Sequence, residues 1–372
     1  MVERRVGFSF PSLSAIDDLL RERADLYERR IDVYQRFFNR TIDDTEVQLA
    51  AIEGARWALL APSGMAAVDL AIATLSPSRA HWVIPDCVYP GTRSYAEEVL
   101  RVEREWTITW LPIRNGAPDW RLFDDVLERR PTGLFLEVIA NPIAFRLPAE
   151  SLTERALRSG VRVVVDNTLA TPAICRPLEW GGDLVVHSAT KFLSGGSVLA
   201  GVVCGNCPTL RDRIRSLRRR TGNVVAPVIA GELVERVRDF PTRFRQQCRN
   251  ATAVSALLAA HPEVERVVHP SLLEGVAPDA GGAVLTVWLG GATPGEAFER
   301  RDRFVAALGP PVCCSTSLGS PVTGILHLGA LDPSASGIEA AAIRISAGVE
   351  AFEALRCSFE RGLAALETSP KR

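Results

Sequence analysis

The stretch from Val164 to Gly205 reads VVDNTLATPAICRPLEWGGDLVVHSATKFLSGGSVLAGVVCG. Three short and nearly continuous apolar runs lie within it or at its start, over 161–165, 184–186 and 200–204. Such runs are typical of strands that are buried on both faces of a parallel sheet. The first run ends in Asp166, and Lys191 follows the second. Because open α/β sheets carry their sites at the carboxyl ends of strands, these two residues are the first candidates for chemistry.

The same pattern extends upstream of this stretch. Further apolar runs cover 57–61, 82–85, 108–111 and 133–139, and helical patterns cover 14–30, 44–53, 66–75, 120–129 and 149–158. Alternating strands and helices predict an α/β fold with a mostly parallel seven-stranded sheet and helices on both of its faces.

The pattern changes near residue 228. A long charged helix is expected first, and shorter strands and helices then follow, over 229–260, 264–268, 281–288, 294–308, 343–346 and 350–366. These elements predict a smaller α+β domain at the C-terminal end of the chain.

The bulk composition narrows the class of protein. The 372 residues are 47% hydrophobic and carry a formal net charge of −1, which gives no reason to expect nucleic acid or an anionic membrane as a partner. We find no apolar segment long enough for a signal peptide or a membrane span, so a cytoplasmic protein with reduced cysteines is expected. Cys204 and Cys207 have CxxC spacing, but a strand end followed by a turn is favoured over a metal or redox site. The run 218–220 of three arginines is expected to be a solvated helix end or a subunit contact.

Lysine is almost absent from this chain. Lys and Arg together number 43, and only Lys191 and Lys371 are lysines. Arginine can replace lysine as a surface cation but not as a nucleophile, because a guanidinium stays protonated. We therefore expect Lys191 to form a Schiff base with an aldehyde; the alternative is a solvated surface lysine.

The neighbours of Lys191 fit the aldehyde cofactor pyridoxal phosphate (PLP). A carboxylate such as Asp166 keeps the cofactor's ring nitrogen protonated, although a strand-end cap is the alternative. Ser188 and Thr190 offer hydroxyl groups to a phosphate. The run Ser63-Gly64-Met65 follows a strand and opens a helix, whose free N–H groups bind phosphate well; an ordinary N-cap is the plainer interpretation.

The stretch 164–205 resembles the signature of the Cys/Met-metabolism PLP enzymes, which include cystathionine γ-synthase, cystathionine γ- and β-lyases and methionine γ-lyase. The resemblance covers about residues 34–360 and implies the fold type I, or PLP-dependent transferase, fold. It implies that Tyr89 stacks on the cofactor ring and helps to move protons, and that Asn141 lies beside the phenolic oxygen. It also implies that Ser317 belongs to the substrate-binding loop and that Arg344 binds the substrate α-carboxylate. Core packing for Tyr89 and a structural ion pair for Arg344 are the alternatives.

The resemblance also carries expectations about assembly. Tyr34 and Arg36 match a segment that reaches the neighbouring subunit's cofactor phosphate in this family; a plain helix surface is the alternative. A homodimer with shared active sites follows, and the family suggests a homotetramer. Residues 1–45 are expected to form an arm that contacts the neighbour, 46–228 the PLP-binding α/β domain, and 229–372 the C-terminal α+β domain.

Departures from the family pattern cluster where the substrate side chain should lie. Pro90 replaces a usual glycine, and the segments 194–198, 320–323 and 326–330 lack the family's usual residues. The expected reaction is a PLP-dependent γ- or β-elimination or replacement on an unusual side-chain-substituted L-amino acid. Lys191 would remove the Cα proton and Tyr89 would protonate the leaving group. Alternatives are an ordinary cystathionine or methionine activity, an aminotransferase or decarboxylase, and a catalytically silent PLP-binding protein.

Overall fold

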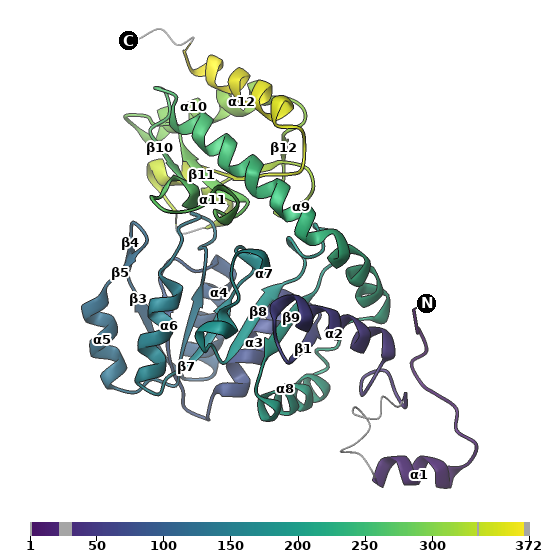
Figure 1. Ribbon diagram of the computed structural model, residues 1–372. Coiled ribbons are helices and arrows are strands. Elements are labelled where there is room, and N and C mark those ends of the chain that lie inside the picture. Colours follow the sequence, from purple (N-terminus) through teal and green to yellow (C-terminus); the bar gives the residue numbers. More distant parts are fainter. Residues whose placement is uncertain (1, 22–31, 333–334, 368–372) are drawn as a thin grey trace.

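Two sheets organise the molecule, and one long helix, α9 (Pro227–Ala259), passes from the larger to the smaller (Figure 1). The computed structural model describes residues 2–21, 32–332 and 335–367. A further two-stranded hairpin, β4 (Ile113–Arg114) with β5 (Ala117–Pro118), extends from the larger half.

The larger sheet has seven strands in the order β1-β9-β8-β7-β6-β2-β3. All seven strands coincide with predicted apolar runs: β1 (Trp57–Ala61), β2 (His81–Pro85), β3 (Thr107–Leu111), β6 (Gly133–Glu137), β7 (Arg162–Asp166), β8 (Leu184–Ser188) and β9 (Gly201–Gly205). Strands β8, β7, β6, β2 and β3 are parallel, whereas β9 runs antiparallel to both β8 and β1. The predicted mostly parallel seven-stranded sheet is confirmed.

Helices cover both faces of this sheet, as predicted. On one face α3 (Gly64–Leu75) and α8 (Pro208–Thr221) share an apolar core with strand side chains that include Trp82 and Phe135. The other face is covered by helices that share a second apolar core, namely α2 (Arg40–Glu53), α5 (Trp120–Glu128), α6 (Ala149–Arg158) and the first part of α9. The sheet is therefore buried on both sides, which explains why its strands are apolar throughout.

The smaller sheet has five strands in the order β10-β11-β14-β13-β12. Its strands are β10 (Arg266–Val268), β11 (Val284–Trp288), β12 (Cys313–Cys314), β13 (Gly324–His327) and β14 (Ile343–Ser346). Helices α10 (Pro294–Leu308) and α12 (Phe352–Glu367) and the end of α9 form a third core with this sheet. Strands β12 and β13 were not predicted, because β12 has only two residues and β13 has only two apolar residues, Ile325 and Leu326, between Gly324 and His327.

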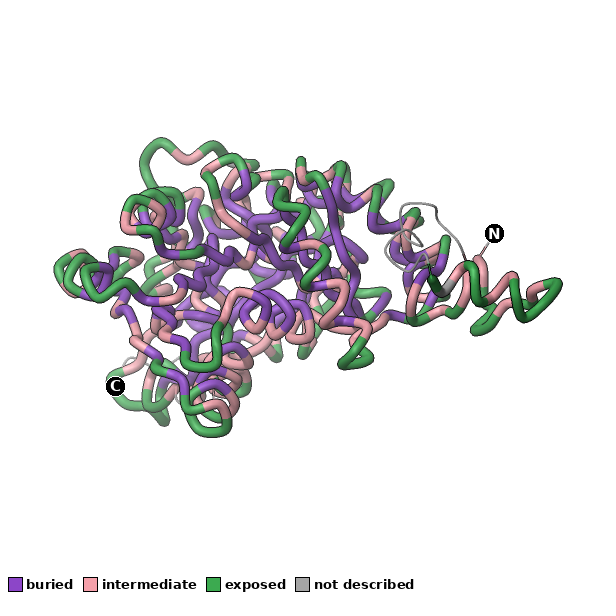
Figure 2. The backbone as a smooth tube through the Cα atoms, turned by 90° about the horizontal axis from the view of Figure 1, so that it is seen from below, coloured by how far each residue is buried: buried purple, intermediate pink, exposed green. Residues whose placement is uncertain are grey.

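The N-terminal end of the chain extends from the body of the molecule (Figure 2). The helix expected over 14–30 begins as α1 (Leu13–Arg21), and residues 22–31 lie outside the described residues, as does Lys371. Leu13 on α1 is 81% exposed. This helix therefore leaves apolar surface uncovered within its own chain.

The arginine run at the end of α8 corrects one expectation. Arg218 is buried rather than solvated, and it forms an ion pair with Glu46 of α2 and donates to the backbone oxygen of Leu60 at 2.9 Å. Because the last turn of the helix packs between α2 and β1, its first arginine faces inward while Arg219 and Arg220 remain nearer the surface.

None of the helices within the described ranges is both long and apolar enough to span a bilayer.

Candidate active site

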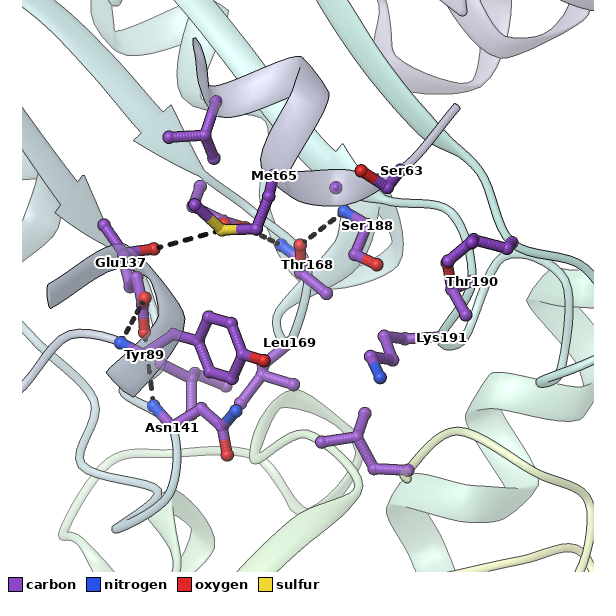
Figure 3. A pocket seen from close by; sticks show the side chains of 17 residues that line it. Ser63, Met65, Tyr89, Glu137, Asn141, Thr168, Leu169, Ser188, Thr190 and Lys191 are labelled. Carbon is purple, nitrogen blue, oxygen red and sulfur yellow. Dashed lines mark hydrogen bonds between the residues drawn. The ribbon is translucent and has the colours of Figure 1, made fainter. Parts of the chain in front are cut away.

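A cavity of about 200 Å³ lies at the carboxyl ends of β6, β7 and β8, beside the start of α3 (Figure 3). It brings together most of the predicted site residues, namely Ser63, Gly64, Met65, Tyr89, Asn141, Asp166, Ser188, Thr190 and Lys191. These residues come from five separate segments of the sequence. Their convergence on one cavity is the geometry that the strand-end argument predicts.

Lys191 lies in the turn after β8 and extends its amine toward the smaller sheet. Its Nζ donates to Oγ of Ser317 at 3.0 Å. Burial lowers the pKa of the Lys191 amine, and the positive charge of Arg344 lowers it further. Both effects favour the neutral, nucleophilic form of the amine.

Two carboxyl groups end adjacent strands at the opposite wall of the cavity. Asp166 ends β7 and Glu137 ends β6, and the two residues are register partners. Asp166 keeps some surface toward the cavity, yet the surrounding protein excludes enough water that burial raises its pKa, against hydrogen bonds from Thr168 that lower it. Burial and the nearby charge of Asp166 raise the pKa of Glu137 well above its ordinary value. Burial thus raises the pKa of both carboxyl groups, and the charge of Asp166 raises that of Glu137 further.

Glu137 is a site residue that the sequence analysis missed. Its Oε1 accepts from the backbone N–H of Tyr89 at 2.7 Å, and its Oε2 accepts from the backbone N–H of Asn141 at 3.2 Å. One side chain thus fixes two segments that carry predicted site residues. The available signal was its place at the end of a buried apolar run, next to the run that ends in Asp166.

The start of α3 and the end of β8 form the part of the cavity suited to a phosphate. Ser63 caps the helix by accepting from Ala66 N–H at 3.1 Å, so the plain N-cap interpretation is correct for its side chain. The first N–H groups of α3, at Gly64 and Met65, have no carbonyl partner within the helix. A Cβ on Gly64 would lie 2.6 Å from Cβ of Ser188, so only glycine allows the helix to approach the strand this closely.

The two hydroxyl groups near the lysine differ in their availability. Thr190 Oγ1 donates to the backbone oxygen of Ala200 at 3.1 Å and accepts from its N–H at 3.2 Å. A phosphate oxygen would have to compete with that carbonyl for the Thr190 proton. Ser188 Oγ has no such commitment in the described part of the chain, and it lines the cavity beside Gly64.

Arg344 lies on β14, at the centre of the smaller sheet, and meets the cavity through Asn141. Its Nη1 donates to Oδ1 of Asn141 at 3.2 Å, and its Nη2 donates to the backbone oxygen of Ser317 at 3.2 Å. The residue is buried, and burial lowers its pKa to about 10, so the guanidinium remains charged at neutral pH. No described carboxylate forms an ion pair with Arg344, so the alternative role as a structural ion pair is wrong. A bound carboxylate would offset the cost of burying this charge.

Tyr89 lies at the rim of the cavity. It precedes α4 (Pro90–Ser94), where Pro90 occupies the first helical position that proline favours. Tyr89 is 42% exposed, so the alternative interpretation, that it packs in the core, is wrong. Figure 3 shows its ring lying across the cavity from Lys191.

Tyr34 and Arg36 do not line the cavity of their own chain. The guanidinium of Arg36 stacks on the rings of Tyr34 and Phe37 and donates to the backbone oxygen of Arg219 at 3.1 Å. Both residues are exposed at the surface. Any role for them at a cofactor would require a second subunit.

The cysteines do not build a site. All eight are free thiols; Cys204 is buried in β9, whereas Cys207 is exposed immediately before α8. Across the described residues, no three His, Cys, Asp or Glu side chains gather in a group that could hold a metal ion.

The cavity fits pyridoxal phosphate. No described side chain forms an ion pair with Asp166. A protonated ring nitrogen of the cofactor would supply the missing positive charge. The open helix start at Gly64 suits the phosphate, and the half-buried amine of Lys191 suits the aldehyde carbon. The side-chain nitrogen of Asn141 forms no hydrogen bond that the described chain provides, so it is free to donate to an oxygen of the ring.

Comparison with known proteins agrees with this chemistry. The family model of the Cys/Met metabolism PLP-dependent enzymes matches residues 16–284. An L-methionine γ-lyase of Fusobacterium nucleatum subsp. polymorphum is 30% identical over 351 residues, which cover 89% of this chain and 86% of that protein. An O-succinylhomoserine sulfhydrylase of Pseudomonas aeruginosa is 28% identical over 358 residues, covering 90% of this chain and 84% of that protein.

The solved structure of a cystathionine γ-synthase from Xanthomonas oryzae pv. oryzae, in complex with cystathionine, has the same fold. It is 25% identical, and it superimposes with a TM-score of 0.86 over 99% of this chain and 93% of that one. The predicted fold type I architecture is thereby confirmed. Because the family match spans most of the sequence and the cavity fits the cofactor, this chain is a PLP-dependent enzyme and belongs to the Cys/Met metabolism family.

Proposed function

We propose that this enzyme catalyses elimination or replacement at the γ- or β-carbon of a side-chain-substituted L-amino acid. The observation that carries the proposal is the position of the Lys191 amine, within hydrogen-bond distance of Ser317 and close enough to Arg344 for that charge to lower its pKa. An amine so placed can hold a carbonyl carbon and then remove a proton from the Cα of a substrate whose carboxylate lies at Arg344.

We assign the cofactor-binding roles as follows. Lys191 holds the aldehyde carbon, Asp166 holds the proton on the ring nitrogen, and Tyr89 stacks on the ring. The phosphate is bound by the start of α3, with the N–H groups of Gly64 and Met65, the Ser63 segment and the Ser188 hydroxyl; Thr190 is a weaker contributor. When bound, pyridoxal phosphate supplies an electron sink for the negative charge that develops at Cα.

The substrate is oriented from the side of the smaller sheet. Arg344 binds the α-carboxylate, and its hydrogen bonds to Asn141 and to the Ser317 backbone fix the plane of its guanidinium. With the carboxylate held there, the Cα hydrogen would face the Lys191 amine, which is the arrangement that proton transfer requires. Ser317 can hold the amine through its hydroxyl before and after the transfer.

Proton delivery to the leaving group is assigned to Tyr89, whose ring lies across the cavity from Lys191. Removal of one proton at Cα supports departure of a β-substituent. Removal of a second proton, at Cβ, supports departure of a γ-substituent. Whether water or another nucleophile then adds depends on the access of each to the cavity.

The relatives do not decide among these reactions, because a lyase and a sulfhydrylase are similar to this chain to nearly the same degree. We favour an unusual substrate, since the departures from the family pattern lie beside the substrate region. The loop 194–198 after Lys191 lacks the family's usual His-Ser-Asp, and a Cβ built on Gly196 would lie 3.8 Å from Cα of Ser320. The second candidate is an ordinary methionine or cystathionine activity, which the L-methionine γ-lyase relative favours.

We further propose that the active unit is a homodimer with shared sites, within a homotetramer. Support comes from the exposure of Tyr34 and Arg36 away from their own cavity and from the exposed Leu13 on α1. Residues 1–45 would then form the arm that contacts the neighbour. Residues 46–228 would form the PLP-binding domain, and 229–372 the domain that carries Arg344.

The direct test is a screen of β- and γ-substituted L-amino acids with the PLP-loaded enzyme, with products identified by mass spectrometry. Release of a keto acid or of a replacement product from one compound would support the proposal. Fast turnover of cystathionine or methionine would instead select the second candidate. If borohydride left no cofactor attached at position 191, the assignment of the lysine would be wrong.

A further inference from the structure

Three polar side chains on one face of helix α9 bind the backbone of three segments next to the site. Arg243, Gln247 and Asn250 are spaced four and three residues apart, so they lie along the same side of the helix. Gln247 and Asn250 are fully buried. Figure 1 shows α9 running from the half with the larger sheet to the half with the smaller sheet, and its two ends belong to the cores of different halves.

Arg243 binds the segment that follows the lysine. Its Nη2 donates to the backbone oxygens of Phe192 at 2.8 Å and Leu193 at 3.2 Å. Its Nη1 is paired with Asp239, one turn earlier on the same helix. The guanidinium therefore fixes the backbone immediately after Lys191 relative to α9.

Gln247 binds the two loops on the substrate side. Its Nε2 approaches three backbone oxygens, those of Ser320 at 2.8 Å, Ala347 at 3.1 Å and Gly319 at 3.5 Å. Ser320 follows the loop that contains Ser317, and Ala347 follows β14. One amide group thus joins the loop that contacts the Lys191 amine to the strand that carries Arg344.

Asn250 completes the arrangement. Its Nδ2 donates to the backbone oxygens of Gly348 at 3.0 Å and Glu350 at 2.8 Å. The carboxylate of Glu350 in turn accepts from Thr323, and Thr323 Oγ1 accepts from the N–H of Gly348. The segments 317–323 and 347–350 therefore form one hydrogen-bonded unit that is held against α9.

This unit also packs directly on the lysine. Gly319 has a φ of +88°, and a Cβ there would lie 2.6 Å from the carbonyl carbon of Lys191. No side chain other than hydrogen fits between the two segments. A shift of the 317–323 loop would therefore change the distance between the Lys191 amine and the groups that bind the substrate.

We propose that Gln247 is a positioning residue for the α-carboxylate site, because it sets Ser317 and Arg344 in register with Lys191. The inference rests on the proposed function for the roles of Ser317, Arg344 and Lys191. The hydrogen bonds of Gln247 are independent of that function. Its Oε1 is buried without a partner among the described residues, so only the N–H₂ end of the amide is used. A carboxylate of the same shape would face three carbonyl oxygens and repel them.

The test compares Gln247→Glu and Gln247→Met with the wild-type protein. Gln247→Glu has the same shape with reversed polarity, and Gln247→Met keeps the volume without donor or charge. Asn206→Asp is the control, an equivalent amide-to-acid change at an exposed residue outside the site. Backbone hydrogen exchange of the apoprotein is expected to accelerate over 317–323 and 347–350 in both variants, and more in Gln247→Glu than in Gln247→Met. Exchange over 162–166 is expected to stay unchanged.

The second measurement uses the PLP-loaded enzyme and L-alanine, which has an α-carboxylate but no leaving group, with binding followed by cofactor absorbance. We expect the affinity for L-alanine to fall about tenfold in Gln247→Glu, and less in Gln247→Met, while PLP affinity stays within about twofold. Unchanged exchange, unchanged L-alanine affinity in a folded variant, or an equal loss of PLP affinity would each overturn the inference. Failure of the wild-type enzyme to bind L-alanine would count against the proposed Arg344 site, whereas the exchange result reports on Gln247 independently.

Discussion

The Lys191 amine lies where its neutral form is favoured, because burial and then the Arg344 charge lower its pKa. Between the folded pKa and the ordinary pKa of lysine, the unfolded chain binds a proton that the folded chain has lost. The free energy of unfolding of the apoprotein therefore gains a contribution as pH rises through that window, and the contribution is absent below it.

The same shift predicts the pH dependence of trapping at Lys191. When the apoprotein is treated with pyridoxal and borohydride, labelling of Lys191 should reach half its maximum rate below the pH required for lysine in an unfolded peptide. Arg344→Gln should move this midpoint upward, but not to the peptide value, since burial is the larger cause. Peptide mass spectrometry of samples labelled across a pH series provides the measurement. An identical midpoint in the folded and unfolded chains would contradict the prediction.

Glu137 provides a prediction about stability. Its two oxygens accept from two part-buried backbone N–H groups, and a glutamine can accept only through one oxygen. Glu137→Gln should therefore lower the free energy of unfolding of the apoprotein by about 0.5–1.5 kcal/mol, the net contribution of one hydrogen bond. Denaturant unfolding measures this, with Glu128→Gln at an exposed position of α5 as the control. Equal stability of both variants would show that the two bonds contribute nothing.

Residue types could be predicted where the chemistry resides in a side chain. The scarcity of lysine pointed to Lys191, and the strand end pointed to Asp166. A strand end also marked Glu137 as a candidate, but the roles of Glu137 and Gln247 could not be predicted, because each acts on the backbone of segments far away in sequence. Such a contribution depends on which carbonyl or N–H group the fold brings near, and no local pattern encodes that.

At the scale of elements, the buried strands were the most predictable part. Their apolar runs are continuous because both faces of the sheet are covered, so the signal does not depend on neighbouring strands. The order of the strands and the antiparallel direction of β9 could not be predicted from these runs. A helix end was expected at the arginine run 218–220, but the range of helix α8 was not predicted, because arginines occupy most of its turns. One of them, Arg218, is buried in an ion pair rather than solvated.

The contact between α3 and β8 supplies a prediction at this scale. Gly64→Ala would place a Cβ 2.6 Å from Ser188 Cβ and 3.0 Å from its Cα, so the helix start and the strand end must separate. We expect PLP affinity to fall by about tenfold or more, because the N–H groups of α3 and the Ser188 hydroxyl would no longer converge on one phosphate.

The matched control for this change is Gly295→Ala on α10, where a Cβ meets only one atom at ordinary contact distance. Titration of each apoprotein with PLP, followed by absorbance, provides the measurement. If Gly64→Ala bound the cofactor as tightly as Gly295→Ala, the phosphate would have to lie elsewhere.

At the scale of the whole molecule, the proposed shared-site dimer makes a quantitative prediction. Lys191→Ala subunits and Arg36→Ala subunits should each be inactive alone. In a mixed dimer, one site combines an intact Lys191 with an intact Arg36, so a random mixture should recover about a quarter of wild-type activity. The measurement is turnover after the two variants are unfolded and refolded together. No recovery in verified hybrid dimers would contradict sharing of the site.

Helix α9 has a last consequence, which concerns how the protein melts. Phe240 and Phe244 belong to the core beneath the seven-stranded sheet, whereas Val254 and Leu258 belong to the core of the five-stranded sheet. Because both cores pack against α9, unfolding of either half would remove apolar contacts from this helix. The other half also depends on the helix for its own core. Calorimetry of the apoprotein should therefore record one cooperative heat-absorption peak, and the carboxyl half expressed by itself, without the first turns of α9, should fail to reach a native state.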